Sequence, residues 1–95
     1  MFERLYDTAE QANIQFVGYA TERTRYDFGI VYTNAFFGKP LVVCMQTNRS
    51  SLLDYHDLDN LTHLQKSFRL TPVEAAEVSS FLRQLIPPLP AKDQY

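Results

Sequence analysis

The sequence predicts an α+β domain in which an antiparallel β-meander of about four to five strands is covered by a C-terminal helix. Apolar side chains alternate along several short runs, and turn-forming residues separate these runs, as in successive strands of a meander. One later run, after Thr71, instead repeats apolar residues at helical spacing. A chain of 95 residues suits one domain, so we expect a single domain over residues 1–95.

The strongest strand pattern runs from Arg25 to Thr33, where Tyr26, Phe28, Ile30 and Tyr32 occupy alternate positions. Alternate side chains of a strand point to the same face, so three rings and an isoleucine share one side. Such a face could be the core, or a platform on which nucleic-acid bases stack. The core is favoured, because the predicted helix needs an apolar face to bury against.

Alternation and turn residues predict the other strands, which are about 13–20, 40–47, 51–55 and 67–70. The strand at 40–47 is apolar on both faces, which is typical of a central strand covered on both sides. Leucines at three-residue spacing between Asp57 and Gln65 predict one or two helical turns before the last strand.

The final helix has the clearest local signals. Thr71 can cap it, Pro72 suits its first position, and Glu74 completes a capping box. Pro87 and the proline after it end the helix, which predicts residues 72–86. Its apolar stripe consists of Ala75, Val78, Phe81, Leu82, Leu85 and Ile86.

The ends of the chain are less regular. Residues 1–12 fit a loose helical stripe and an edge strand equally well, and residues 87–95 are expected to be a proline-rich flexible tail. The sequence has no signal-peptide pattern and no apolar run near the ~20 residues of a membrane span, so we expect a cytoplasmic protein without a membrane partner. The only cysteine, Cys44, is expected to be a small buried hydrophobe.

Three arginines form one candidate site. In a meander every second turn lies at the same end of the sheet, so Arg23, Arg25 and Arg49 are expected to be neighbours that could bind a phosphate or carboxylate. Pairing with Glu22, Asp27 and other surface acids is the simpler interpretation. Nucleic acid is not expected as a partner, because the net charge of −2 provides no attractive field for it.

A second candidate site is the turn with Phe36, Phe37 and Lys39. Two adjacent phenylalanines are unusual in a turn. We expect one ring to lie under the sheet and the other to be exposed as a contact for a partner or a second copy.

The only cluster with metal-ligand chemistry contains His56, Asp57 and His63. These residues lack the spacing that places ligands on one helix face, and Asp57 or Asp59 is more simply a helix N-cap. No metal or other cofactor is therefore expected. The sequence also lacks a phosphate-binding glycine loop and a nucleophile elbow, so an enzyme is the weaker class.

The middle of the chain resembles a family of small cytosolic proteins of Bacillus-type Gram-positive bacteria that is known as a domain of unknown function. The residues that carry the resemblance are Arg25-Tyr-Asp27, Ile30, Thr33, Phe36-Phe-Gly-Lys39, Leu41-Val42, Gln46-Thr47 and Arg49. The likeness extends to residues 57–59 and the capped final helix. It implies the fold and the compartment, and it implies no activity.

The leading hypothesis is therefore a non-enzymatic protein-interaction module that forms a homodimer or small homo-oligomer and whose other protein partner is unknown. One predicted helix covers one face of a sheet whose central strand is apolar on both sides, and a second copy could cover the other. The alternatives are a binding module for an anionic ligand or nucleic acid at the three arginines, and a metal-dependent enzyme at His56, Asp57 and His63.

Overall fold

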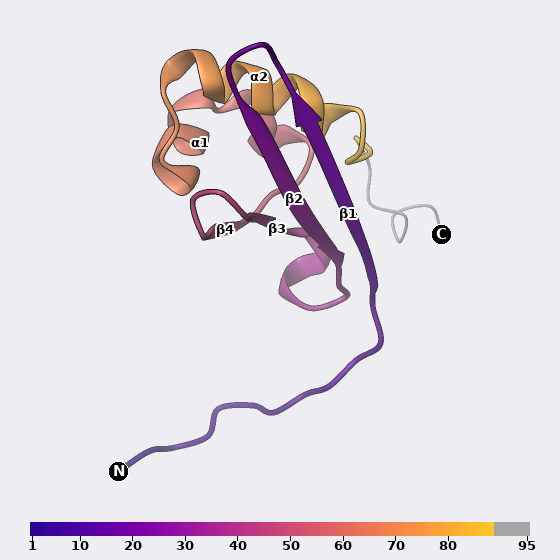
Figure 1. The fold of residues 1–95 in the computed structure, drawn as a ribbon. Helices are drawn as coiled ribbons and strands as arrows, with labels where there is room; N and C mark the ends of the chain where they lie inside the picture. The colour runs from indigo at the N-terminus through magenta and orange to yellow at the C-terminus, as the bar shows by residue number, and fades with distance from the viewer. Residues whose placement is uncertain (89–95) are drawn as a thin grey trace.

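We analysed a computed structural model that describes residues 1–88. Its core element is one antiparallel sheet with the strand order β1-β2-β3-β4 (Figure 1). This confirms the predicted α+β meander, with four strands in the described part. The strands are β1 (Asn13–Ala20), β2 (Arg25–Tyr32), β3 (Leu41–Cys44) and β4 (Arg49–Leu52).

Two α-helices follow the strands and lie together on one side of the sheet (Figure 1). The helical elements are η1 (Phe36–Gly38), η2 (His56–Asp59), α1 (Leu61–Phe68) and α2 (Pro72–Arg83). None of the helices in residues 1–88 has the length and apolar character needed to cross a bilayer. The predicted tail at 87–95 lies almost entirely outside the described residues.

The inner face of β2 is the core, as predicted. Tyr26, Phe28 and Ile30 are buried, and the ring of Phe28 lies 6.1 Å from that of Phe68 in α1 and 6.3 Å from that of Phe81 in α2. The alternative, a platform for stacking bases, is wrong because the helices cover these rings. Cys44 is also fully buried, as expected.

Helix α2 begins with the predicted capping box. The Glu74 amide donates to the Thr71 hydroxyl at 3.2 Å, and the Thr71 amide donates to the Glu74 carboxylate at 2.9 Å. The helix ends at Arg83, before the predicted Ile86. Ile86 nevertheless stays buried, with its amide bonded to the Leu82 carbonyl at 2.9 Å.

Helix α1 corrects the prediction of a strand at 67–70. The helix continues to Phe68 because Leu64 and Phe68, one turn apart, are both fully buried. Arg69 then ends it with a left-handed backbone (φ 58°), and its amide bonds to the Gln65 carbonyl. The Asn60 side chain caps the helix at the His63 amide, so the expected Asp57 or Asp59 cap is also wrong.

The fourth strand is also earlier than predicted, at Arg49–Leu52 rather than 51–55. After it, the Asp54 and Asp57 carboxylates each accept a hydrogen bond from the other's amide at 2.9 Å. These two side-chain bonds close a loop in place of strand pairing. Ser79 of α2 then holds η2, because its hydroxyl donates to the Leu58 carbonyl at 2.7 Å.

Two valines of α2 test whether burial against the sheet stabilises this fold. Val78 is fully buried, whereas Val73 is 69% exposed. We expect Val78→Ala to lower the free energy of unfolding by about 1.5–3 kcal/mol. Val73→Ala should change it by less than about 0.5 kcal/mol. Urea unfolding followed by circular dichroism measures both, and equal effects would contradict the assignment of the core.

Candidate interaction surface

The structure does not bring the three predicted arginines together. Arg49 is paired with Cys44, which in turn is paired with Phe28 of the inner face, so Arg49 belongs to the helix side of the sheet. Arg25, three residues before Phe28 on β2, belongs to the opposite face. Arg23 lies in the turn between β1 and β2, where its amide bonds to the Thr21 hydroxyl at 3.2 Å.

Arg25 has an acidic partner on its own strand. Its Nε and Nη2 atoms donate to the two oxygens of Asp27 at 3.2 and 3.3 Å. These hydrogen bonds and one from Gln46 hold the pKa of Asp27 below its usual range. Pairing of an arginine with a surface acid is the simpler interpretation given above. Anion binding at the three arginines stays a prediction.

The turn after β2 exposes both of its phenylalanines. Phe36 is 51% exposed and Phe37 is 89% exposed, so the expectation that one ring lies under the sheet is wrong. Both residues have a positive φ (54° and 63°), which is costly for a bulky side chain, and Gly38 follows with 74°. A role of this turn in partner contact stays a prediction.

Lys39, the third residue of that predicted contact, connects two loops. Its ammonium lies 3.0 Å from Asp57 and 3.8 Å from Asp54. The hydrogen bond to Asp57 raises the pKa of Lys39 despite partial burial. Burial tends to raise the pKa of Asp57, but hydrogen bonds from the Asp54 amide and Lys39 lower it overall.

The weak metal candidates do not form a common site. Within residues 1–88, no group of three or more His, Cys, Asp or Glu side chains has a geometry that could hold a metal ion. Asp57 is bound by Lys39, and the His63 ring lies 3.4 Å from the Ser67 hydroxyl on its own helix. His56 is exposed.

The middle of the outer face of the sheet, opposite the helices, is largely apolar. Phe16 and Met45 both lie over Gly29, where an added Cβ would lie 3.2 Å from Met45 Cε and 3.4 Å from Phe16 Cε1. Phe16 is 73% exposed, Ile14 56% and Met45 45%. Together with half-buried neighbours they form what we call the outer patch: Ile14, Phe16, Val31, Leu41, Val43, Met45 and Leu52.

Strand β1 adds an unprotected sheet edge to this surface. Within the described sheet it pairs only with β2, and its eight residues include no charged side chain and no proline. Charges, prolines and short length are the usual features that keep edge strands from pairing. This edge is therefore open to a further strand.

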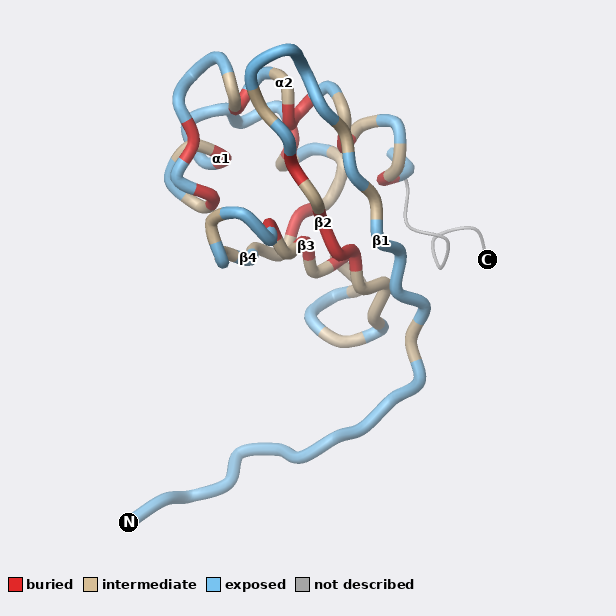
Figure 2. The backbone as a smooth tube through the Cα atoms, viewed as in Figure 1, coloured by how far each residue is buried: buried red, intermediate tan, exposed pale blue. Residues whose placement is uncertain are grey.

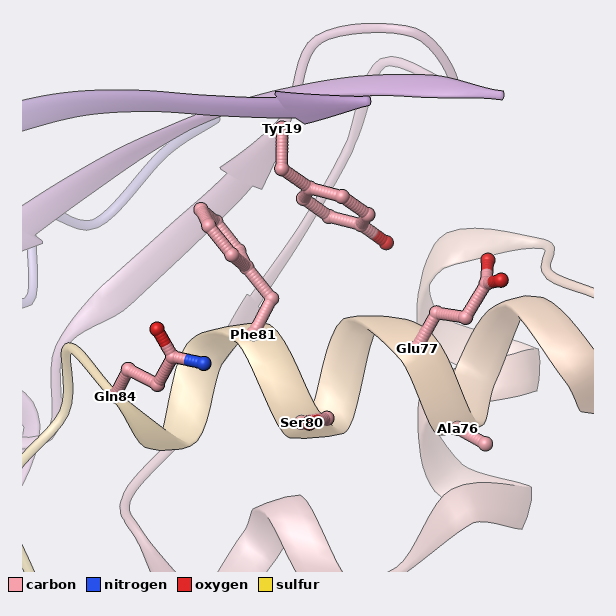
Figure 3. Close-up of a pocket in the computed structure, with 6 residues that line it drawn as sticks. All are labelled: Tyr19, Ala76, Glu77, Ser80, Phe81 and Gln84. Carbon is pink, nitrogen blue, oxygen red and sulfur yellow. The ribbon is translucent and has the colours of Figure 1, made fainter. Parts of the chain in front are cut away.

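A hollow of about 420 Å³ lies between β1 and α2 (Figure 3). The ring of Tyr19 from β1 meets that of Phe81 from α2, with their centroids 4.4 Å apart. Burial, with Glu77 nearby, raises the pKa of Tyr19 to about 12, and its hydroxyl finds no hydrogen-bond partner among the described residues. The residues that line the hollow are Tyr19, Ala76, Glu77, Ser80, Phe81 and Gln84.

Residues 1–11 precede β1 as an extended arm that leaves the domain (Figure 1). Figure 2 shows the arm exposed along almost its whole length. Glu10 fixes its base, because its carboxylate accepts hydrogen bonds from the Thr33 hydroxyl and the Asn34 amide. These bonds, that from Thr33 first, lower the pKa of Glu10.

The outer patch and the open edge of β1 were not predicted as sites from the sequence. The alternation of Ile14 and Phe16 with Val17 and Tyr19 was visible in the sequence. Which of the two sets faces the helices depends on the pairing of β1 with β2. The absence of charge in 13–20 was the available signal for an unprotected edge.

Comparison with known proteins finds a family match over most of the chain. The family described as SAV0927-like matches residues 5–84, which include most of the arm, the whole sheet and both helices. Among curated proteins, none matches the chain. The match confirms a small domain family, and the bacterial source expected from the sequence stays a prediction.

The pair formed by Lys39 and Asp57 gives a pH-dependent prediction. A carboxyl group whose pKa is lowered by folding stabilises the fold above its unfolded pKa, and this contribution disappears as the pH falls through its folded pKa. We expect Lys39→Met to lower the free energy of unfolding by about 0.5–1 kcal/mol at pH 7, since the pair is partly exposed. The effect should be smaller near pH 3, below the ordinary aspartate pKa of about 3.9, because Asp57 begins to be protonated there.

Urea titrations at both pH values measure the difference between wild type and Lys39→Met. Lys66→Met, on the exposed face of α1, is the control that removes the same charge. An effect of Lys39→Met that is the same at both pH values would show that the charge pair is not its cause.

Proposed function

The chain belongs to the SAV0927-like family, and we propose that it is a non-enzymatic protein-interaction module that self-associates through the outer patch. The observation that carries the proposal is the apolar character of a sheet face that no described element covers. Both helices pack on the inner face, and the sheet is open, with β1 and β4 as its edges.

The energetics of the outer patch favour burial by a partner. Full burial of a large apolar side chain contributes about 1.5–3 kcal/mol, and Ile14, Phe16 and Met45 are all largely exposed in one copy. Contiguous apolar surface of this kind is typical of protein contacts. A second copy presents the same patch, so a two-fold arrangement would bury both at once.

The other hypotheses have less support. Arg25 and Arg49 belong to opposite faces of the sheet, so an anionic ligand could not contact the three arginines from one side without a rearrangement. For the metal-dependent enzyme, the described residues offer no cluster of ligands. A cytoplasmic location and a Bacillus-type source remain part of the proposal, on the basis of the sequence.

Lysine substitution in the outer patch tests this function. We expect the wild type to be a dimer with a dissociation constant of about 1–100 µM. Phe16→Lys combined with Met45→Lys should raise that constant by at least about 100-fold, because charge would be buried in an apolar contact. Sedimentation velocity over a concentration series measures it.

The matched control is Val73→Lys combined with Thr62→Lys, which adds the same charge at exposed positions of the two helices. It should leave the dissociation constant unchanged, and circular dichroism should show the same fold for both variants. A wild type that stays monomeric up to about 1 mM, a very weak affinity, would overturn the proposed self-association.

A further inference from the structure

We infer that the arm of one copy, residues 1–11, adds as a strand to the open edge of β1 in a second copy, with its inward-facing side chains over the hollow between β1 and α2. This rests on the proposed self-association and adds a second contact between copies, made by the arm and the sheet edge. The occupant of the edge is thus a part of this same chain.

The arm carries apolar side chains that its own domain does not cover. Phe2 is 99% exposed, Leu5 83% and Tyr6 69%. In residues 1–9 of the described chain, the one ion pair joins Arg4 to Asp7 within the arm itself. Aromatic side chains bury roughly 150–250 Å² each, so such an arm can supply a large part of the roughly 800 Å² that each partner of a stable complex buries.

The base of the arm is already fixed. The bonds from Thr33 and Asn34 to Glu10 hold the chain at the start of β1, so fewer residues have to be ordered when a second copy binds. The arm is extended, with no helix or strand of its own. An extended segment needs little rearrangement to pair with a sheet edge.

The edge of β1 suits an incoming strand better than that of β4. It has eight residues without charge or proline, whereas β4 has four and begins with Arg49. A strand that pairs with β1 satisfies its outward backbone groups and extends the outer patch.

Symmetry relates the arm to the edge directly, because the arm and β1 are consecutive in the chain. An antiparallel ribbon with its two-fold axis near residues 11–12 places residues 3–10 of each copy opposite 13–20 of the other. Each copy then gains one strand and gives one. The two-fold axis of such a ribbon is perpendicular to the sheet, so the two outer patches lie on the same face of one continuous sheet, and contact between outer patches is a separate interface.

On the hollow side, the chemistry agrees with this register. Paired residues of a ribbon share a face, so Arg4 lies opposite Tyr19 and Tyr6 opposite Val17, on the hollow side. Arg4 then approaches Glu77, and the ring of Tyr6 approaches the rings at the hollow. On the other side Leu5 lies opposite Gly18, which the Asp27 carboxylate approaches, and Asp7 lies opposite Phe16 at the border of the outer patch.

Substitution of the arm tests the inference separately from the outer patch. Leu5→Asp combined with Tyr6→Asp should raise the dimer dissociation constant at least about 10-fold, because it removes two apolar contacts. The control, Thr62→Asp combined with Val73→Asp, adds the same charge on the helices and should have no effect. Since the arm is exposed in one copy, neither variant should lower the thermal unfolding temperature at a concentration where the protein is monomeric.

A cross-link tests the register. Proteins with Tyr6→Cys and with Val17→Cys are mixed and oxidised, and we expect a mixed disulfide between the two chains on a non-reducing gel. Tyr6→Cys mixed with Ser50→Cys, on β4, is the control and should give none. The native Cys44 is buried and present in every sample.

The outcomes separate the two proposals. If the wild type is a dimer that the arm variant leaves unchanged, or a dimer in which no Tyr6–Val17 cross-link forms, the arm exchange is overturned and self-association through the outer patch stands. If the wild type is a monomer, the proposed function itself is overturned.

Discussion

The burial of the aromatic side chains of β2 against the two helices is the interaction on which the fold depends. Phe28 lies at its centre, because its ring contacts Phe68 from α1 and Phe81 from α2. One side chain therefore joins the sheet to both helices. A domain of this size buries a smaller fraction of its surface than a large domain does, so the loss of such a contact would remove a large share of its stability. The capping box of α2 and the bonds around Asp57 then position the helices for this packing.

This packing has a consequence for the other side of the sheet. All of the described helices that could cover β2 are on its inner face, so the apolar residues of the outer face have no cover within one copy. Phe16 and Met45 both lie over Gly29, and they stay about half exposed or more. The open edge of β1 and the arm before it lie beside this same surface. This uncovered surface is the physical basis of the self-association that we propose.

Much of the fold could be predicted from local patterns. The alternation in β2 and the signals at Thr71 and Glu74 depend on neighbouring residues only, and both predictions were confirmed. The strand expected at 67–70 was wrong, because the burial of Leu64 and Phe68 extended α1 through a segment with no local helix signal. The predicted proximity of the three arginines failed for another reason. That prediction considered only the direction of each strand. The position of a residue along the sheet and the face on which it lies depend instead on the pairing register.

The sequence by itself determined that this protein has a meander with an aromatic inner strand and a capped final helix, since periods of two and of about 3.6 residues can be recognised along the chain. Only the tertiary structure decided which side of each strand the helices cover, because a shift of one residue in pairing exchanges the two faces. That choice buried Tyr26 and Phe28 and left Phe16 exposed. The surface that we propose for self-association is therefore a product of register and packing.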